Sequence, residues 1–139
     1  MSPSKSLAKD YFERAVVRLA VVELLQRERA HADAVRESQE CLELALKGLL
    51  RSVGVEPPKW HDVSKVLLKE SSRLPQSVQM HLERICRFSG KMRRDRELSF
   101  YGEEDFLPTE QYGQDDSNAA YTELSWVLDL LKDHFKGVE

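Results

Sequence analysis

The sequence has little of what secreted and membrane proteins depend on. Its 139 residues include two cysteines, Cys41 and Cys86, without metal-like spacing. No run approaches the roughly 18 apolar residues of a membrane span. Residues 2–10 lead into no apolar segment of the kind that a signal peptide needs. We therefore expect reduced, buried thiols in a soluble, cytoplasmic protein.

Glycine, proline and excess charge are also scarce. Six glycines and five prolines leave long stretches uninterrupted, and no alternation typical of β-strands appears. The formal net charge of −3 argues against a protein that binds nucleic acid over its whole surface, so any such site must be local. With 41% hydrophobic residues, the chain is long enough to bury a core as one domain, residues 1–139.

Helical periodicity dominates the chain. Apolar residues recur at intervals of three and four, which predicts long helices over 5–28, 32–53, 77–98 and 116–136 and a short one over 62–71. Residues 41–50 are apolar nearly all round, as is typical of a central helix. The loop 100–115 is too long for a simple connection, so we expect it to be functional or to pack over the bundle. The predicted fold class is all-α, an up-and-down four-helix bundle with one extra short helix.

The first helix has an apolar stripe, formed by Phe12, Ala15, Val16, Leu19 and Val22. This spacing predicts that one side of the helix faces the core.

The densest basic cluster lies in the fourth long helix. At ~100° per residue, Arg84, Arg87, Lys91 and Arg94 share one face. This row is either a solvated face paired with acids or a series of phosphate contacts along a nucleic-acid backbone. Arg96 falls instead on the apolar line of the same helix. A buried guanidinium needs an acceptor or a groove, so Arg96 is the first candidate functional residue.

Glu43 and Lys47 interrupt the apolar second helix four residues apart, with the acid first. One interpretation is a simple intrahelical ion pair. The other is a buried polar network that also includes Arg96, because buried charges need partners.

The remaining candidates do not complete a known site. Glu28 and His31 form one Glu-x-x-His, but a di-metal bundle needs a second pair, so we predict no metal. His81 and His134 lie among charged neighbours, and we expect them in solvent. No glycine-rich phosphate loop or nucleophile elbow occurs, and we predict no cofactor.

Taken in order, several segments resemble the HEPN domain (higher eukaryotes and prokaryotes nucleotide-binding). The resemblance covers about residues 5–136 and implies a four- to five-helix up-and-down bundle. The matching pieces are Glu43–Leu50, Gly54, His61-Asp62 before Leu67-Leu68, Arg96–Gly102, Pro108, Tyr112 and a last helix rich in alanine and leucine.

The resemblance also implies a class of activity. Many HEPN domains are metal-independent ribonucleases with an arginine followed, after four to six residues, by a histidine, and two subunits bring these motifs together in a dimer cleft. Many are toxins paired with a minimal nucleotidyltransferase (MNT) antitoxin, which in some cases AMPylates a tyrosine near the motif. By this resemblance the protein is a homodimer with an MNT-type partner, in a toxin–antitoxin pair.

Arg96 matches the motif arginine, but Tyr101 stands where the histidine is expected, and no histidine occurs between Arg96 and His134. A phenol with a pKa near 10 is a poor base at pH 7. The resemblance therefore favours binding over cleavage. The candidate nucleotide- or RNA-binding residues are Arg96, Tyr101, Glu43, Lys47 and Tyr112.

Two other functions stay open. In a ribonuclease, Arg96 would stabilise the phosphorane while Tyr101 or His61 moves the proton. A structural interaction partner would bind no ligand. The sequence favours the nucleotide- or RNA-binding module, acting alongside an MNT nucleotidyltransferase.

Overall fold

The structure, a computed structural model, describes residues 2–59 and 62–138, and within these ranges the chain is almost entirely helical. The described residues form no strand, only an isolated bridge between Glu103 and Phe106. The all-α prediction is therefore confirmed. The elements are α1 (Pro3–Arg27), α2 (His31–Ser52), α3 (Val63–Lys69), a 3-10 turn (Ser71–Arg73), α4 (Gln76–Gln79), α5 (Leu82–Phe100), α6 (Pro108–Gln111) and α7 (Gln114–Lys136).

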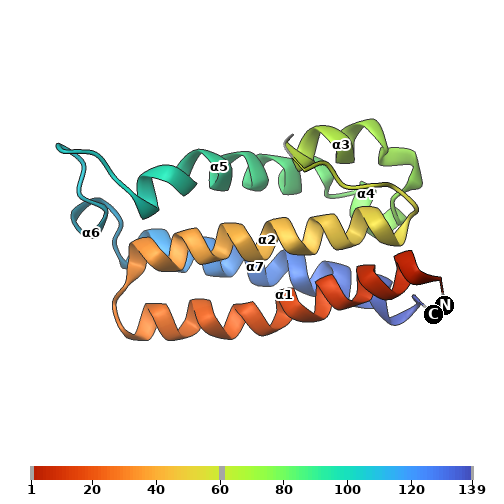
Figure 1. Ribbon diagram of the computed structural model, residues 1–139, viewed down its shortest axis with the longest axis horizontal. Helices are drawn as coiled ribbons and strands as arrows, with labels where there is room; N and C mark the ends of the chain where they lie inside the picture. The colour runs from red at the N-terminus through yellow and green to blue at the C-terminus, as the bar shows by residue number, and fades with distance from the viewer. Residues whose placement is uncertain (1, 60–61, 139) are drawn as a thin grey trace.

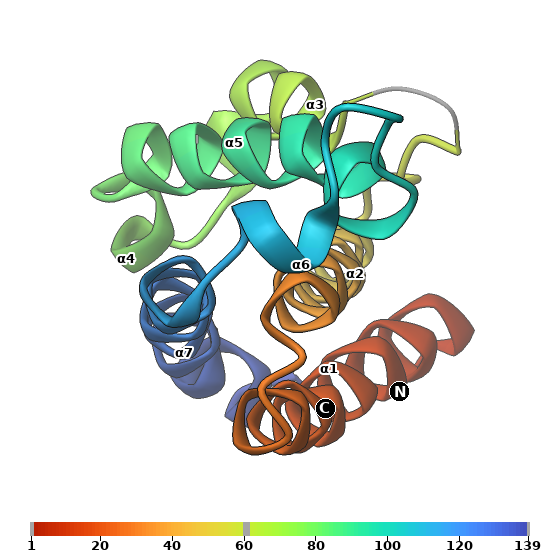
Figure 2. The same ribbon diagram turned by 90° about the vertical axis from the view of Figure 1, so that its left-hand side faces the viewer.

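Four long helices form the body of the molecule, and α2 is at its centre. Figure 1 shows α1, α2, α5 and α7 running alongside one another, and Figure 2 shows α2 between α1 and α5, with α7 beside it. The buried side chains of α2 include Leu42, Leu46, Leu49 and Leu50. Because residues 41–50 of α2 are apolar nearly all round, this part of the helix fits a position that neighbouring helices cover on several sides.

The single helix predicted over 77–98 is wrong. The chain turns at Met80 and His81, so α4 ends at Gln79 and α5 begins at Leu82. No glycine or proline marks this break. Residues on both sides of this break make contacts with other parts of the fold. Val78 is fully buried in the core, and the His81 ring meets the ring of Trp126 in α7 edge-on, with centroids 5.3 Å apart. The described chain thus has three short α-helices rather than one.

The 100–115 segment packs over one end of the bundle, which was one of its two interpretations, but it contains the short helix α6 where a continuous loop was predicted. Figure 2 shows α6 lying across that end, and α6 contacts both α2 and α5. The turn into the segment depends on Gly102, whose φ is 69°. A Cβ at this position would lie 2.5 Å from the carbonyl oxygen of Phe106, so the turn excludes any side chain.

Both thiols are free, and both are poor nucleophiles near neutral pH. Cys41 is buried, and its thiol donates to the Ala15 carbonyl at 3.0 Å. Burial raises the pKa of Cys41 to about 12 and that of the half-buried Cys86 to about 11. The described residues contain no helix long and apolar enough to cross a membrane.

Candidate functional site

Arg96 lies in the last two turns of α5 and reaches across to α2. Its Nη2 is 3.0 Å from Oε1 of Glu40, and the two side chains are 45% and 30% exposed. Within the described residues no donor reaches that oxygen with hydrogen-bond geometry, so the contact is an ion pair. The prediction that Arg96 continues the buried stripe is wrong. The long side chain carries its charge to the edge of the bundle, where it meets an acid and solvent.

A second arginine and two aromatic rings adjoin this ion pair. Nη2 of Arg36 is 3.7 Å from the same oxygen of Glu40, and the Arg36 guanidinium lies 4.3 Å from the centroid of the Phe100 ring. Phe100 meets Tyr101 edge-on at 4.6 Å. As whole residues, Phe100 and Tyr101 are 45% and 72% exposed. We call these five residues, Arg36, Glu40, Arg96, Phe100 and Tyr101, the Arg96 surface.

The Arg96 surface combines positive charge with exposed aromatic area. Two guanidinium groups share one carboxylate, which leaves a net charge of about +1 at the edge of the bundle. A guanidinium has five N–H donors, and the ion pair with Glu40 involves only the Nη2 nitrogen of Arg96. Such an arrangement suits a phosphate, which accepts bidentate hydrogen bonds, next to a base, which stacks on an aromatic ring.

Glu43 and Lys47 form the intrahelical pair that was one of the two interpretations. Nζ of Lys47 is 3.3 Å from Oε1 of Glu43, and Gln39 donates to the other oxygen at 2.8 Å. The alternative network with Arg96 does not form, because Glu40, one turn earlier in α2, takes that place. Beside Glu43 lies a cavity of only about 10 Å³, too small for any ligand.

Tyr112 belongs to a different surface. Its hydroxyl donates to Oδ1 of Asp95 at 3.3 Å. Burial, and then the neighbouring Asp95 carboxylate, raises the pKa of Tyr112 to about 12. Asp95 and Arg96 point in directions ~100° apart around α5, so Tyr112 is not brought to the Arg96 surface. His61, the weakest catalytic candidate, lies outside the described residues.

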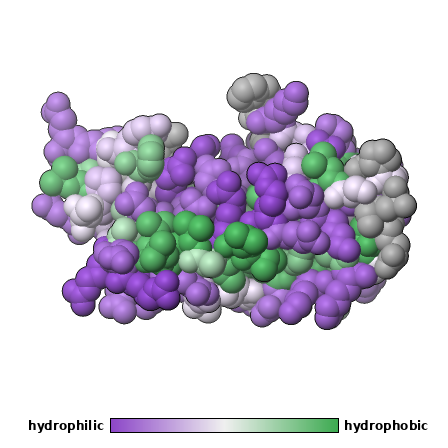
Figure 3. All heavy atoms as spheres, turned by 60° about the horizontal axis from the view of Figure 1, so that its bottom comes forward, coloured by the Kyte–Doolittle hydropathy of each residue, from purple (hydrophilic) through white to green (hydrophobic). Residues whose placement is uncertain are grey.

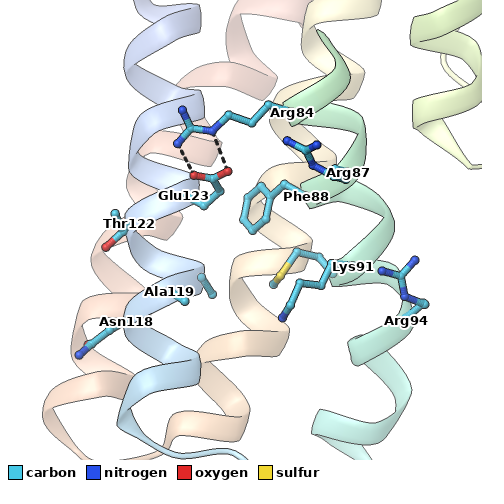
Figure 4. A pocket seen from close by; sticks show the side chains of 11 residues that line it. Arg84, Arg87, Phe88, Lys91, Arg94, Asn118, Ala119, Thr122 and Glu123 are labelled. Atoms are coloured by element: carbon cyan, nitrogen blue, oxygen red, sulfur yellow. Dashed lines mark hydrogen bonds and ion pairs between the residues drawn. The ribbon is translucent and has the colours of Figure 1, made fainter. Parts of the chain in front are cut away.

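A larger groove, of about 690 Å³, lies between α5 and α7. Figure 4 shows the basic row along one rim, with Phe88 between it and α7. Arg84 makes two hydrogen bonds to Glu123, the Nε one at 3.0 Å, and they hold the pKa of that carboxyl below its ordinary value. The sequence predicted the row but not the groove, whose other wall belongs to α7. The groove is lined by Arg84, Arg87, Phe88, Lys91, Met92, Arg94, Asn118, Ala119, Ala120, Thr122 and Glu123.

Most of the basic row is paired with acids. Lys91 lies 3.1 Å from Asp95, and Arg87 lies 3.7 Å from Glu83. The Arg94 side chain is exposed. The row therefore corresponds mainly to the solvated, acid-paired face that was one of its two interpretations.

A family model for the HEPN domain matches residues 8–133. The chain belongs to the HEPN domain family. No curated protein and no solved structure matches it. The match covers nearly the whole four-helix bundle, which agrees with the resemblance found in the residues of α2, α5 and α7.

In this HEPN domain each described histidine is engaged away from the Arg96 surface. His31 Nδ1 is 2.8 Å from the Ser117 hydroxyl, and His134 Nε2 is 2.7 Å from that of Ser52. His134 is half-buried, and burial lowers its pKa. The expectation that His81 and His134 lie in solvent is wrong, because α7 packs against both the α4–α5 turn and the end of α2. No three metal-ligating side chains gather among the described residues.

Proposed function

We propose that this HEPN domain binds a nucleotide or RNA at the Arg96 surface and acts with an MNT-type nucleotidyltransferase in a toxin–antitoxin pair. At the family level the chain is a nucleotide- or RNA-related module. The observation that carries the proposal is the pair of arginines around one carboxylate, next to two exposed aromatic rings.

Each side chain has a distinct role in this proposal. Glu40 holds Arg96 in place, so less rotamer freedom is lost when the guanidinium binds a phosphate. Phe100 holds Arg36 in the same way. Tyr101, the most exposed ring, offers a face for a base.

Glu43 and Lys47 would contact only a longer ligand. They follow Arg36 and Glu40 at helical spacing on the same face of α2. An RNA strand that continues along this face would meet the ammonium of Lys47, while the adjacent Glu43 would restrict where a phosphate can lie. The proposal leaves out Tyr112, which lies on the other flank of α5.

A metal-independent ribonuclease is the second function that the sequence left open. It requires a proton-transfer group beside Arg96. On the Arg96 surface Tyr101 stands at the motif position, and near pH 7 a phenol is a much weaker general base than an imidazole. We therefore propose binding with little or no cleavage.

We also propose that the protein is a homodimer. The apolar residues 41–50 of α2 are covered by α1, α5 and α7 of the same chain, so they give no support to an interface. The support comes instead from apolar side chains on the outer face of α1, most of all Val17, which is 68% exposed. Closed two-fold dimers are the commonest form of protein self-assembly.

The proposal is tested by incubating the purified protein with labelled ATP and with total RNA, in the presence of EDTA. We expect retention of one or both ligands by the wild type, weaker retention by Arg96→Ala, and RNA of unchanged length. If neither ligand is retained, the binding function is refuted. If RNA is cleaved with EDTA present, the ribonuclease becomes the better interpretation, and Tyr101 and His61 are the residues to replace next.

A further inference from the structure

A polar cavity of about 290 Å³ lies where the turn between α1 and α2 meets the start of α7. Figures 1 and 2 place this turn at the same end of the bundle as α6. Figure 3 shows hydrophilic residues gathered at this end of the α1 face, beside the hydrophobic area farther along the helix. We call it the turn cavity, and it is lined by Gln26, Arg27, Arg29, His31 and Gln114.

Every side chain that lines the turn cavity can donate a hydrogen bond, and two of them are permanent cations. The guanidinium groups of Arg27 and Arg29 each carry five N–H donors and no acceptor. His31 and Gln114 are the first residues of α2 and α7, so the positive ends of two long helix dipoles lie at the cavity wall. A cavity with this lining favours an anion over a cation or an apolar group.

Two hydrogen bonds hold the turn cavity in shape by joining the turn to α7. Nδ1 of His31 lies 2.8 Å from the hydroxyl of Ser117, which is fully buried. Because Nδ1 is engaged there, only Nε2 of His31 remains to contact a ligand. Nε2 of Gln26 donates to Oδ1 of Asn118 at 2.9 Å. The walls of the cavity therefore keep their positions relative to each other before any ligand binds.

The backbone of Arg29 is the strongest observation. Its φ is 60°, the only positive value at a described residue other than glycine. The amide of Arg29 donates to the carbonyl of Gln26 at 3.0 Å, and the amide of the next residue, Ala30, donates to that of Leu25 at 2.8 Å. This pair of bonds is a Schellman motif, in which glycine is the usual residue at the left-handed position. A Cβ disfavours that conformation, so an arginine there makes the turn less stable.

The end of α2 provides an internal comparison. The same motif recurs there, with the amide of Gly54 donating to Arg51 at 3.1 Å and that of Val55 donating to Leu50 at 2.9 Å. Gly54 stands at the left-handed position, with a φ of 82°. The chain thus uses glycine where the motif only ends a helix, and arginine where the motif borders a cavity. This contrast points to a role for the Arg29 side chain outside folding.

We propose that the turn cavity binds a phosphate group, with Arg29 as its main ligand and Arg27 and His31 as further donors. A phosphate offers acceptor oxygens in several directions, and the donors come from three directions, the end of α1, the start of α2 and the start of α7. This site is separate from the Arg96 surface and does not rest on it. His31 and Arg36, which belong to the two sites, point ~140° apart around α2.

The first test measures urea unfolding by circular dichroism, with and without inorganic phosphate at constant ionic strength. It uses the Arg96→Ala background, so that the Arg96 surface does not contribute. Phosphate should raise the urea midpoint of this protein, because a ligand that binds only the folded chain stabilises it. Adding Arg29→Gly should raise the midpoint measured without phosphate, because glycine relieves the backbone at a φ of 60°, and it should abolish the further rise with phosphate.

Two control variants separate the side chain from the backbone. Arg14→Ala removes the same charge from α1 at a position away from the cavity, so phosphate should still raise its urea midpoint. Gly54→Arg creates the same unfavourable backbone at the end of α2. It should lower the midpoint measured without phosphate and leave the effect of phosphate unchanged.

A second measurement identifies the source of the phosphate group. Fluorescence anisotropy with labelled ATP and with a short labelled RNA, in EDTA and in the Arg96→Ala background, compares proteins with and without Arg29→Gly. A loss of affinity of roughly tenfold for both probes supports a site for any phosphate group. A loss for ATP alone supports a nucleotide site, and a loss for RNA alone supports a contact to its backbone.

Three results would overturn the proposal. The first is no effect of phosphate in the Arg96→Ala background, and the second is an effect that survives Arg29→Gly. The third is a lower midpoint for Arg29→Gly without phosphate, since Arg29 would then stabilise the turn itself. The Arg96 surface is tested separately, by comparing the wild type with Arg96→Ala, so either site can fail without the other.

Discussion

Replacing Arg96 by alanine should weaken phosphate binding far more than replacing Arg94. Both arginines lie near the end of α5 and carry the same charge, so long-range attraction of an anion is nearly equal for the two. They differ in local structure. Arg96 is held by Glu40 at 3.0 Å beside Arg36, whereas Arg94 is exposed beside the α5–α7 groove. Arg94→Ala is therefore a matched control.

The magnitude follows from the exposure of the two side chains. A charge-assisted hydrogen bond contributes about 1.5–3 kcal/mol when it is shielded from water. The Arg96 side chain is 45% exposed, so we take the lower end of that range, which corresponds to a roughly tenfold rise in dissociation constant. An exposed cation contributes less than about 1 kcal/mol, which predicts a change below about fivefold for Arg94→Ala.

The assay is fluorescence anisotropy with labelled ATP and with a short labelled RNA, repeated at several salt concentrations. If Arg96 contacts an RNA phosphate, Arg96→Ala should also lower the salt dependence by about one counterion. Arg96→Lys should recover little, because an ammonium lacks the planar fork. Equal losses from Arg96→Ala and Arg94→Ala would refute the assignment and would favour the α5–α7 groove as the binding surface.

Three further predictions concern chemistry and stability. Tyr101→His should raise metal-free cleavage of a structured RNA, assayed with EDTA present, because an imidazole populates both protonation states near pH 7; strong wild-type cleavage that survives Tyr101→Phe would contradict this. Gly102→Ala should lower the free energy of unfolding, measured in urea, by more than about 1 kcal/mol, because φ at this position is 69° and the added Cβ would meet Phe106. Gly90→Ala within α5 should instead raise the free energy of unfolding by up to about 1 kcal/mol. If both substitutions changed it in the same direction, the steric argument would be refuted. Burial lowers the pKa of His134 in the fold, so the unfolded chain binds the proton more readily, and the free energy of unfolding should fall as the pH drops below about 6.5. His134→Gln should remove that component of the pH dependence in urea melts, and an unchanged pH profile would contradict it.

Sequence periodicity predicted the long helices because it depends only on neighbouring residues. The α2 helix was predicted over 32–53 and runs from His31 to Ser52, and Gly54 follows it with a φ of 82°. The break at Met80 and His81 could not be predicted in this way, since no local residue causes it. It coincides with contacts to α7, 45 residues later for the His81–Trp126 pair.

In the candidate site, too, the sequence predicted the direction in which a side chain leaves its helix but not how deeply that side chain is buried. Angles around α5 correctly placed the basic row away from the core, and they gave Arg96 a direction toward α2. They could not show how deep the side chain lies, because depth depends on what α2 presents at that level. Glu40 and solvent meet Arg96 there, rather than a closed apolar wall. Arg36 and Phe100 were missed for a similar reason, since their contact joins the start of α2 to the end of α5.

The first helix shows most clearly that sequence periodicity finds an apolar face but not what covers it. The predicted stripe contains Phe12, Ala15 and Val22, which are buried, but also Val16, which is 45% exposed. A periodic pattern identifies apolar faces without saying which molecule covers each of them. Here the bundle covers one face of α1 and leaves the other to solvent, so the second face requires a separate explanation.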